Sequence, residues 1–94
     1  MGLVFEWDKK KDKKNIAKHS VSFEEASTVF ADDLSLTISD PLHSEEEDRF
    51  VIIGESINHR LLVVVHTKRT DHIRLISARE ATKKERKYYE SKYK

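Results

Sequence analysis

The chain has 94 residues, of which 18 are Lys or Arg, 17 are Asp or Glu and none is Cys. A chain of this length has room for one hydrophobic core, so residues 1–94 are expected to form a single domain. The lack of cysteine excludes disulfides, thiolate metal sites and cysteine nucleophiles, and it favours a reducing compartment such as the cytoplasm. No apolar run approaches the roughly 20 residues of a membrane helix, and no signal peptide is recognisable, so no membrane partner is expected.

The formal net charge of +1 is an average over segments of opposite sign. Residues 8–19 hold six lysines against two aspartates, and residues 60–94 hold eleven basic residues against four acidic ones. Between them, residues 20–59 hold ten acidic residues against the single Arg49. A folded domain can therefore have a basic face for a polyanion and an acidic face for a cationic partner. The alternative is that these charges only solvate helix surfaces.

The beginning of the chain is predicted to form a strand followed by a surface helix. Residues 3–7 are aromatic and β-branched, which is typical of a strand. Asp8 is a suitable N-cap, and residues 9–19 are rich in good helix formers. Apart from Ile16 and Ala17 this helix has little apolar content, so a narrow buried stripe and a lysine-rich exposed surface are expected.

A second helix and a second strand are predicted next. Ser22 and Glu25 have the spacing of a capping box, which opens a helix over residues 23–31. Apolar and polar residues alternate over residues 34–39, and this period indicates a half-buried strand. The acidic segment 40–48 has no apolar period and is predicted to be an exposed loop.

The second half of the chain is predicted to contain three strands and a helix. Residues 50–55 and 61–67 are apolar and β-rich, and the polar break between them is typical of an antiparallel hairpin. A further strand is expected over residues 72–78, and Thr82 with Glu85 forms a second capping box at the start of a basic helix. Consecutive hairpins after two helices predict an α+β fold with a mostly antiparallel, twisted sheet, two N-terminal helices and one C-terminal helix.

The residue spacing gives no indication of a metal or nucleotide site. The five histidines lack the His-x-x-x-His and His-Glu-x-x-His spacings of metal ligands, and no cysteine supports them. Gly2 and Gly54 are the only glycines, so the chain has no glycine-rich phosphate loop. We therefore expect no metal and no cofactor.

Polar residues inside the predicted strands are the better candidates for a site. His66 shares a strand face with Leu62 and Val64, and Arg74 is expected on the same side of its strand as His72 and Ala78. If the two strands are neighbours, an imidazole and a guanidinium can lie on one surface, with further arginines near the strand ends. Metal-free RNA cleavage needs a proton acceptor, a proton donor and cations around the phosphate. The alternative is that these polar residues bond to backbone or to acidic groups at a sheet edge.

Six segments in this order resemble the BrnT family of type II toxins, and the resemblance spans nearly the whole chain. The segments are Phe5-Glu6-Trp7-Asp8, Lys18-His19-Ser20-Val21-Ser22-Phe23-Glu24-Glu25-Ala26, Val29-Phe30-x-Asp32, the acidic loop from Asp40 to Arg49, Ile53-Gly54, and Ile73-Arg74-Leu75-Ile76-Ser77-Ala78-Arg79-x-Ala81-Thr82 followed by Glu85 and Tyr89. The resemblance implies a RelE-like fold and a ribonuclease toxin that inhibits translation. It also implies a BrnA-type antitoxin with a DNA-binding domain, a toxin–antitoxin heterotetramer, and binding to operator DNA only through that complex.

The polar positions of the family can be carried over to this chain residue by residue. From them we assign a metal-independent endoribonuclease site in which His66 is the preferred general acid or base. The arginines assigned to catalysis are Arg60, Arg74 and Arg79. Substrate-binding roles are assigned to Arg49, Ser77 and Thr82.

Two positions depart from the pattern of the family, and at the first of them, directly after Asp8, this chain has Lys9 where the family often has Pro. At the second, many members have Gly after the Lys-His pair, where a helix ends in a left-handed conformation, whereas this chain has Ser20. If Ser20 keeps that conformation, the cost is about 1 kcal/mol. Both departures concern the fold rather than the chemistry.

Two other functions remain open from the sequence. The first is a non-catalytic module whose basic segments bind nucleic acid through phosphate contacts, and the second is a co-repressor half of a DNA-binding complex. The acidic segment that includes Glu45, Glu46 and Glu47 is predicted either to face a basic part of the antitoxin or to keep RNA off one face of the toxin.

Overall fold

The computed structural model describes residues 3–40 and 49–92. The elements in chain order are β1 (Phe5–Glu6), α1 (Lys9–His19), α2 (Phe23–Ser27), the 3₁₀ helix η1 (Thr28–Ala31), β2 (Leu36–Ser39), β3 (Arg49–Glu55), β4 (Leu61–Lys68), β5 (Ile73–Glu80) and α3 (Lys83–Ser91). One sheet has the strand order β1-β5-β4-β3-β2, and all its pairs are antiparallel except β1 with β5. The predicted α+β class is confirmed. None of the described helices is long and apolar enough to cross a bilayer.

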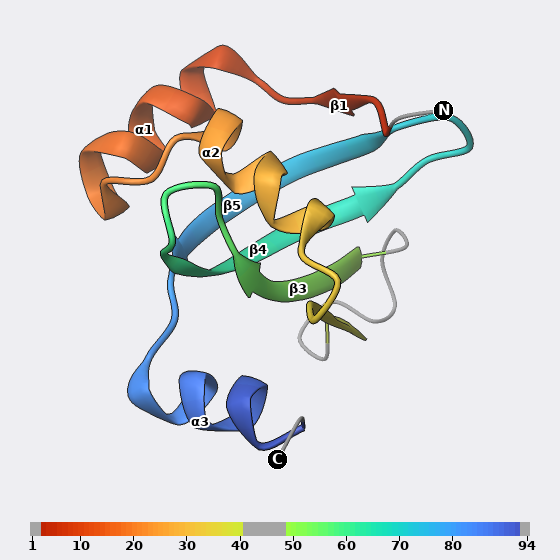
Figure 1. Ribbon diagram of the computed structural model, residues 1–94. Helices are drawn as coiled ribbons and strands as arrows, with labels where there is room; N and C mark the ends of the chain where they lie inside the picture. Colours follow the sequence, from red (N-terminus) through yellow and green to blue (C-terminus); the bar gives the residue numbers. More distant parts are fainter. Residues whose placement is uncertain (1–2, 41–48, 93–94) are drawn as a thin grey trace.

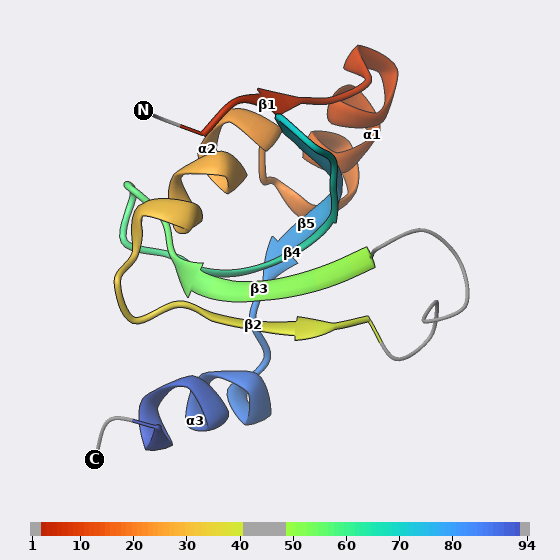
Figure 2. The same cartoon turned by 90° about the vertical axis from the view of Figure 1, so that its right-hand side faces the viewer.

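The helices lie on both sides of the sheet. Figures 1 and 2 show α1, α2 and η1 on one side and α3 on the other. We call these sides the α1 face, which carries Leu62, Val64 and Leu75, and the α3 face, which carries Val63 and Val65. The two sets alternate along their strands because successive side chains of a strand point to opposite sides.

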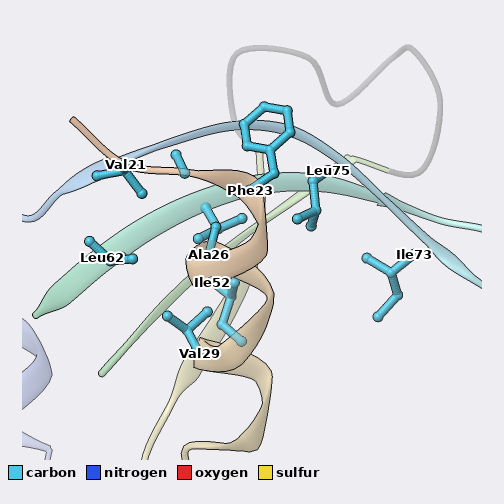
Figure 3. Packing of buried hydrophobic residues seen from close by; sticks show 10 residues of the cluster. Val21, Phe23, Ala26, Val29, Ile52, Leu62, Ile73 and Leu75 are labelled. Atoms are coloured by element: carbon cyan, nitrogen blue, oxygen red, sulfur yellow. The ribbon is translucent and has the colours of Figure 1, made fainter. Parts of the chain in front are cut away.

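The main hydrophobic core fills the α1 face. Phe23, Ala26 and Val29 from the helical segment pack against Leu62 and residues of the neighbouring strands, and Figure 3 shows this packing. The α3 face has a smaller cluster of Ile53, Leu61 and Val63, against which Tyr89 of α3 packs. Helix α3 therefore covers one end of its face and, among the described elements, is the only helix on that side.

The predicted start and end of α1 are confirmed by the contacts at its ends. Asp8 accepts hydrogen bonds from the backbone N–H groups of Lys10 at 2.7 Å and Lys11 at 3.3 Å. Ser20 ends the helix with φ 59° and ψ 31°, and its N–H donates to the carbonyl of Ile16. The left-handed terminus is thus kept without glycine, at the small cost expected for Ser.

Of the two predicted capping boxes, one is complete and one is half formed. Thr82 accepts from the N–H of Glu85, and the Glu85 carboxylate accepts from the N–H of Thr82. Ser22 likewise accepts from the N–H of Glu25. The carboxylate of Glu25 does not return to Ser22, because it binds Arg60 and Ser56 of the β3–β4 connection.

Three predicted segments differ from the structure. The helix over residues 23–31 changes to a 3₁₀ helix after Ser27, where the hydroxyls of Ser27 and Thr28 bond to carbonyls of the preceding turn. The strand over residues 34–39 begins at Leu36, because the N–H groups of residues 34 and 35 bond to Asp32. Asp40 is buried rather than exposed, and the rest of the predicted acidic loop, including Glu45, Glu46 and Glu47, lies outside the described residues.

Asn15, rather than Ile16 or Ala17, is the residue that α1 buries. Its Nδ2 donates to the carbonyls of Val21 and Ala78, each at 2.8 Å, and its Oδ1 accepts from the N–H of Ala78 at 3.1 Å. Ile16 is 44% exposed. The helix is therefore held to β5 by a buried amide, which the apolar pattern did not predict.

Replacing Asn15 with Ala is expected to lower the free energy of unfolding by about 3 kcal/mol, because buried backbone groups of Val21 and Ala78 lose their partners. Urea unfolding of the variant measures this loss. Lys14→Ala, at an exposed position of the same helix, is the matched control. Equal stability of the two variants would contradict the role assigned to Asn15.

Candidate active site on the α3 face

The strand register brings four of the predicted site residues to the α3 face. Residues paired across neighbouring strands share a face of the sheet. Thr67 of β4 pairs with a β3 residue on one side and a β5 residue on the other, as do Val65 and Val63. Each set of residues paired across the three strands forms one row on this face. The polar residues in the three rows are Arg49, Arg74, Ser77 and Arg79.

The arginines lie around an aliphatic strip on this face. The row through Val65 continues across β3 to Val51 and across β2 to Ile38, which is 47% exposed. Arg74 and Arg79 lie on either side of this row along β5, with side chains 34% and 41% exposed. Guanidinium groups present a planar fork of donors that matches phosphate oxygens. The α3 face thus combines exposed apolar surface with groups suited to an anion.

Arg74 belongs to a chain of charged contacts at the corner where β1 joins the sheet. Its Nη1 donates to Oε2 of Glu6 at 2.8 Å, and Oε1 of Glu6 lies 3.3 Å from Nε2 of His72. The Nδ1 of His72 lies 2.6 Å from Oδ1 of Asp71. The hydrogen bond from Arg74 holds the pKa of Glu6 below its usual value, and the contact with His72 does the same for Asp71.

Glu6 and His72 were not among the residues predicted for the site. The strand pattern already placed His72 on the same side as Arg74, two residues away, and this spacing was the available signal. Nothing in the sequence indicated that β1 pairs in parallel with β5 so that Glu6 lies opposite Arg74.

Arg79 connects the end of β5 to the start of α3. Its Nη1 and Nη2 donate to the two carboxylate oxygens of Glu85, each at 2.8 Å. These bonds raise the pKa of Arg79 and lower the pKa of Glu85 to about 2. Thr82 is the N-cap of the same helix, so Arg79 and Thr82 have structural contacts at the edge of the α3 face.

Arg60 is held by Glu25 and also lies 3.6 Å from the carboxylate of Glu80. Its Nε donates to Oε2 of Glu25 at 3.0 Å and its Nη2 to the carbonyl of Ser20 at 2.9 Å. Arg60 lowers the pKa of Glu25 to about 2. These contacts tie the β3–β4 connection to α2 and to the end of α1. The structure does not bring Arg60 to the face that carries Arg74 and Arg79.

His66 lies on the α1 face, so the expected shared surface of His66 and Arg74 is wrong. Arg74 pairs with Thr67, the neighbour of His66, and a β-bulge between Val65 and His66 shifts the register of β4 against β5. The extra residue is Ile76, and because of it Arg74 and Ala78 fall on opposite faces although their spacing is even. A bulge of this kind leaves no signal in the alternation of residue types.

The surroundings of His66 are mainly aromatic. Its ring centre lies 4.8 Å from that of Phe30, edge to face, and 6.0 Å from that of Phe50, which is stacked on it. The imidazole is 4% exposed and, with Thr37 and Lys68, lines a cavity of about 280 Å³. Its Nδ1 lies 3.3 Å from the carbonyl of Val64. The catalytic role assigned to His66 stays a prediction, and the structure separates it from the arginines of the α3 face.

The stability of the fold is expected to depend on the protonation of His66. Burial lowers the pKa of this imidazole, so protons bind more readily to the unfolded chain, in which histidine titrates at about 6.5. The free energy of unfolding should therefore decrease as the pH falls below about 6.5, until the folded imidazole is protonated too. Urea unfolding at pH 7 and pH 5.5 measures this slope. His66→Leu should flatten it, and an unchanged slope in the variant would contradict the assignment.

The chemistry of the α3 face is that of an anion site without a cluster of metal ligands. Over residues 3–40 and 49–92, no group of three His, Cys, Asp or Glu is arranged to hold a metal ion. Cationic donors, a serine hydroxyl and the Glu6–His72 pair are the groups available on this face. They are suited to binding a phosphodiester and to moving protons beside it.

Comparison with known proteins identifies the family. The chain is similar to the crystal structure of the Brucella abortus ribonuclease toxin BrnT, with a TM-score of 0.67 and 21% identity over 87% of this chain and 100% of that chain. No curated protein sequence matches it. The family described as ribonuclease toxin, BrnT, of type II toxin–antitoxin system matches residues 7–85. Because this match covers most of the chain, the protein belongs to the BrnT family of ribonuclease toxins of type II toxin–antitoxin systems.

Proposed function

We propose that this ribonuclease toxin binds RNA on the α3 face and cleaves it without a metal ion. The observation that carries the proposal is the gathering of Arg49, Arg74, Ser77 and Arg79 on that face. Family membership supplies the ribonuclease activity. The face supplies the cations that a phosphodiester requires.

The proposed chemistry is attack by the 2′-hydroxyl of RNA on the adjacent phosphorus. The negative charge that develops on the phosphoryl oxygens is stabilised by Arg74 and Arg79, whose guanidinium groups are held in place by Glu6 and Glu85. Ser77, between them on β5, donates a hydrogen bond to a phosphate oxygen, and Arg49 adds a cation across the sheet. The roles predicted for Arg60 and His66 are secondary in this proposal, because neither side chain lies on the α3 face with Arg74 and Arg79. The role predicted for Thr82 is secondary because its hydroxyl caps α3.

The test is cleavage of a labelled RNA by the purified toxin in excess EDTA. We expect cleavage to continue, and we expect a substrate with 2′-deoxy sugars to remain intact. Cleavage that requires added Mg²⁺ would contradict metal independence. Salt-sensitive RNA binding without any product, with or without metal, would instead favour a non-catalytic binding module.

A type II toxin has an antitoxin partner. We propose that this partner is a BrnA-type protein with a DNA-binding domain, that the two form a heterotetramer, and that the complex binds operator DNA. Free toxin in the cytoplasm would cleave RNA and inhibit translation. Co-expression with the product of the adjacent gene, followed by native mass spectrometry, gives the partner and the stoichiometry. Binding of operator DNA by the toxin alone would contradict the assignment of DNA binding to the antitoxin.

The acidic middle of the chain is proposed to contact a basic part of the antitoxin. Residues 20–59 hold ten acidic side chains. Charge reversal at Glu45, Glu46 and Glu47 should weaken binding to the antitoxin at low salt, because attraction between exposed charges is screened only weakly there. Unchanged affinity would favour the other interpretation, in which this segment repels RNA.

A further inference from the structure

Three ionisable side chains meet at the corner of β1 and β5 on the α3 face. Glu6 and Arg74 are cross-strand partners with a 2.8 Å hydrogen bond, and Nε2 of His72 lies 3.3 Å from the other oxygen of Glu6. All three side chains are partly exposed. Each of the three side chains is therefore accessible to a phosphate of the RNA.

We propose that Glu6 and His72 are the general base and general acid of RNA cleavage at this corner, with Arg74 binding the reacting phosphate. The inference rests on the proposed function, since it assigns proton-transfer groups to the same face. A carboxylate, an imidazole and a guanidinium are sufficient for the two proton transfers and the charge stabilisation of this reaction. Within the described residues, this is the place where all three kinds of group meet on the α3 face.

The proposed step is balanced in atoms and protons. The Glu6 carboxylate takes the proton of the 2′-hydroxyl as the 2′-oxygen forms a bond to phosphorus. The bond between phosphorus and the 5′-oxygen breaks, and the imidazolium of His72 donates a proton to that leaving oxygen. The products are a 2′,3′-cyclic phosphate and a 5′-hydroxyl. Exchange of one proton with water at each residue restores carboxylate and imidazolium for the next cycle.

Neighbouring groups position His72 and surround it with charge. Asp71 contacts Nδ1 at 2.6 Å, which leaves Nε2 directed to Glu6 and to the substrate. His72 also lines a hollow of about 180 Å³ together with Arg69 and Thr70 of the β4–β5 connection. Arg69 therefore lies beside the corner, where the chain of the RNA would continue away from the reacting phosphate.

Arg74 connects substrate binding to the basicity of Glu6. Without substrate, its hydrogen bond lowers the pKa of Glu6 and makes this carboxylate a weak base. A phosphate bound by Arg74 competes for the same donor. Glu6 then loses the contact that stabilises its charge, and it becomes a stronger base when the substrate is in place.

The experiment compares Glu6→Gln and His72→Gln with wild type in single-turnover cleavage under EDTA, alongside RNA affinity. Each variant should cleave RNA at about one hundredth of the wild-type rate or below. Its affinity for RNA should stay within about twofold of the wild-type affinity. Glu55→Gln and His59→Gln are matched controls, because Glu55 and His59 form a similar 3.0 Å contact at the exposed β3–β4 connection. These controls should cleave at the wild-type rate.

Two further measurements distinguish proton transfer by His72 from a structural role of this side chain. Imidazole added to His72→Ala should restore cleavage, which a purely structural role would not allow. Mass spectrometry of the products should show the cyclic phosphate. If wild type cleaves in EDTA while both variants cleave at its rate, or if imidazole fails to rescue, the acid–base pair is overturned and the proposed function stands. If wild type itself does not cleave, the proposed function fails.

Discussion

Replacing both Arg74 and Arg79 with Gln is expected to lower the rate of RNA cleavage by about 10²–10³-fold or more. Removing even one fixed donor that stabilises developing negative charge has an effect of this size, and the two side chains lie on the same face of β5. Single-turnover cleavage in EDTA measures the loss. Lys10→Gln with Lys13→Gln makes the same change in charge on the exposed surface of α1 and should leave the rate nearly unchanged.

The contact of Arg79 with Glu85 requires a second control. Arg79→Gln breaks the two hydrogen bonds that join β5 to α3, so a slower reaction can follow from a displaced helix. Glu85→Gln weakens the same contact but keeps the arginine. We expect Glu85→Gln to retain cleavage. If it is as slow as Arg79→Gln, the arginine acts through the position of α3 and does not bind the phosphate.

Replacing Glu25 with Ala is expected to lower the free energy of unfolding at pH 7 by about 3 kcal/mol. Breaking a buried ion pair typically costs 3–5 kcal/mol, and the lower end applies here because the side chain of Arg60 is partly exposed. The loss also includes the 2.7 Å hydrogen bond from Ser56. Urea unfolding measures it, with Glu24→Ala as the matched control in the same first turn of α2. Equal losses in the two variants would contradict the role of the pair.

The effect of Glu25 is expected to depend on pH in the acidic range. Its pKa is about 2 in the folded protein, against an ordinary value of 4.5. A carboxyl with a lowered pKa contributes stability above its unfolded pKa and loses it as the pH falls through its folded pKa. The difference between wild type and Glu25→Ala should therefore be complete above pH 5 and shrink between pH 4.5 and pH 2.

Local sequence signals predicted most of the secondary structure of this toxin. Asp8 and the Thr82–Glu85 pair predicted the starts of α1 and α3 because helix caps depend on side chains only a few residues apart. The alternation of apolar residues likewise predicted β3 and β4. These signals need no knowledge of the rest of the fold.

The candidate site was less predictable because it depends on pairing between distant segments. The bulge at Ile76 decides on which face Arg74 lies, and the parallel pairing of β1 decides that Glu6 meets it. Similarly, Arg60 was predicted as a site cation because nothing local indicated that Glu25 would bind it across 35 residues. Sequence patterns predicted which residue types matter but not which of them meet.

Every role proposed for Arg74, Arg79 and His72 requires RNA to bind to the α3 face of the sheet. NMR can locate the bound RNA when methyl-labelled toxin is titrated with an RNA whose 2′-hydroxyls are methylated and which is therefore not cleaved. We predict shifts of the methyl signals of Ile38 and Val65, which lie on the α3 face. Shifts confined to Thr37 and Ile73, which line the cavity beside His66 on the opposite face, would contradict binding to the α3 face.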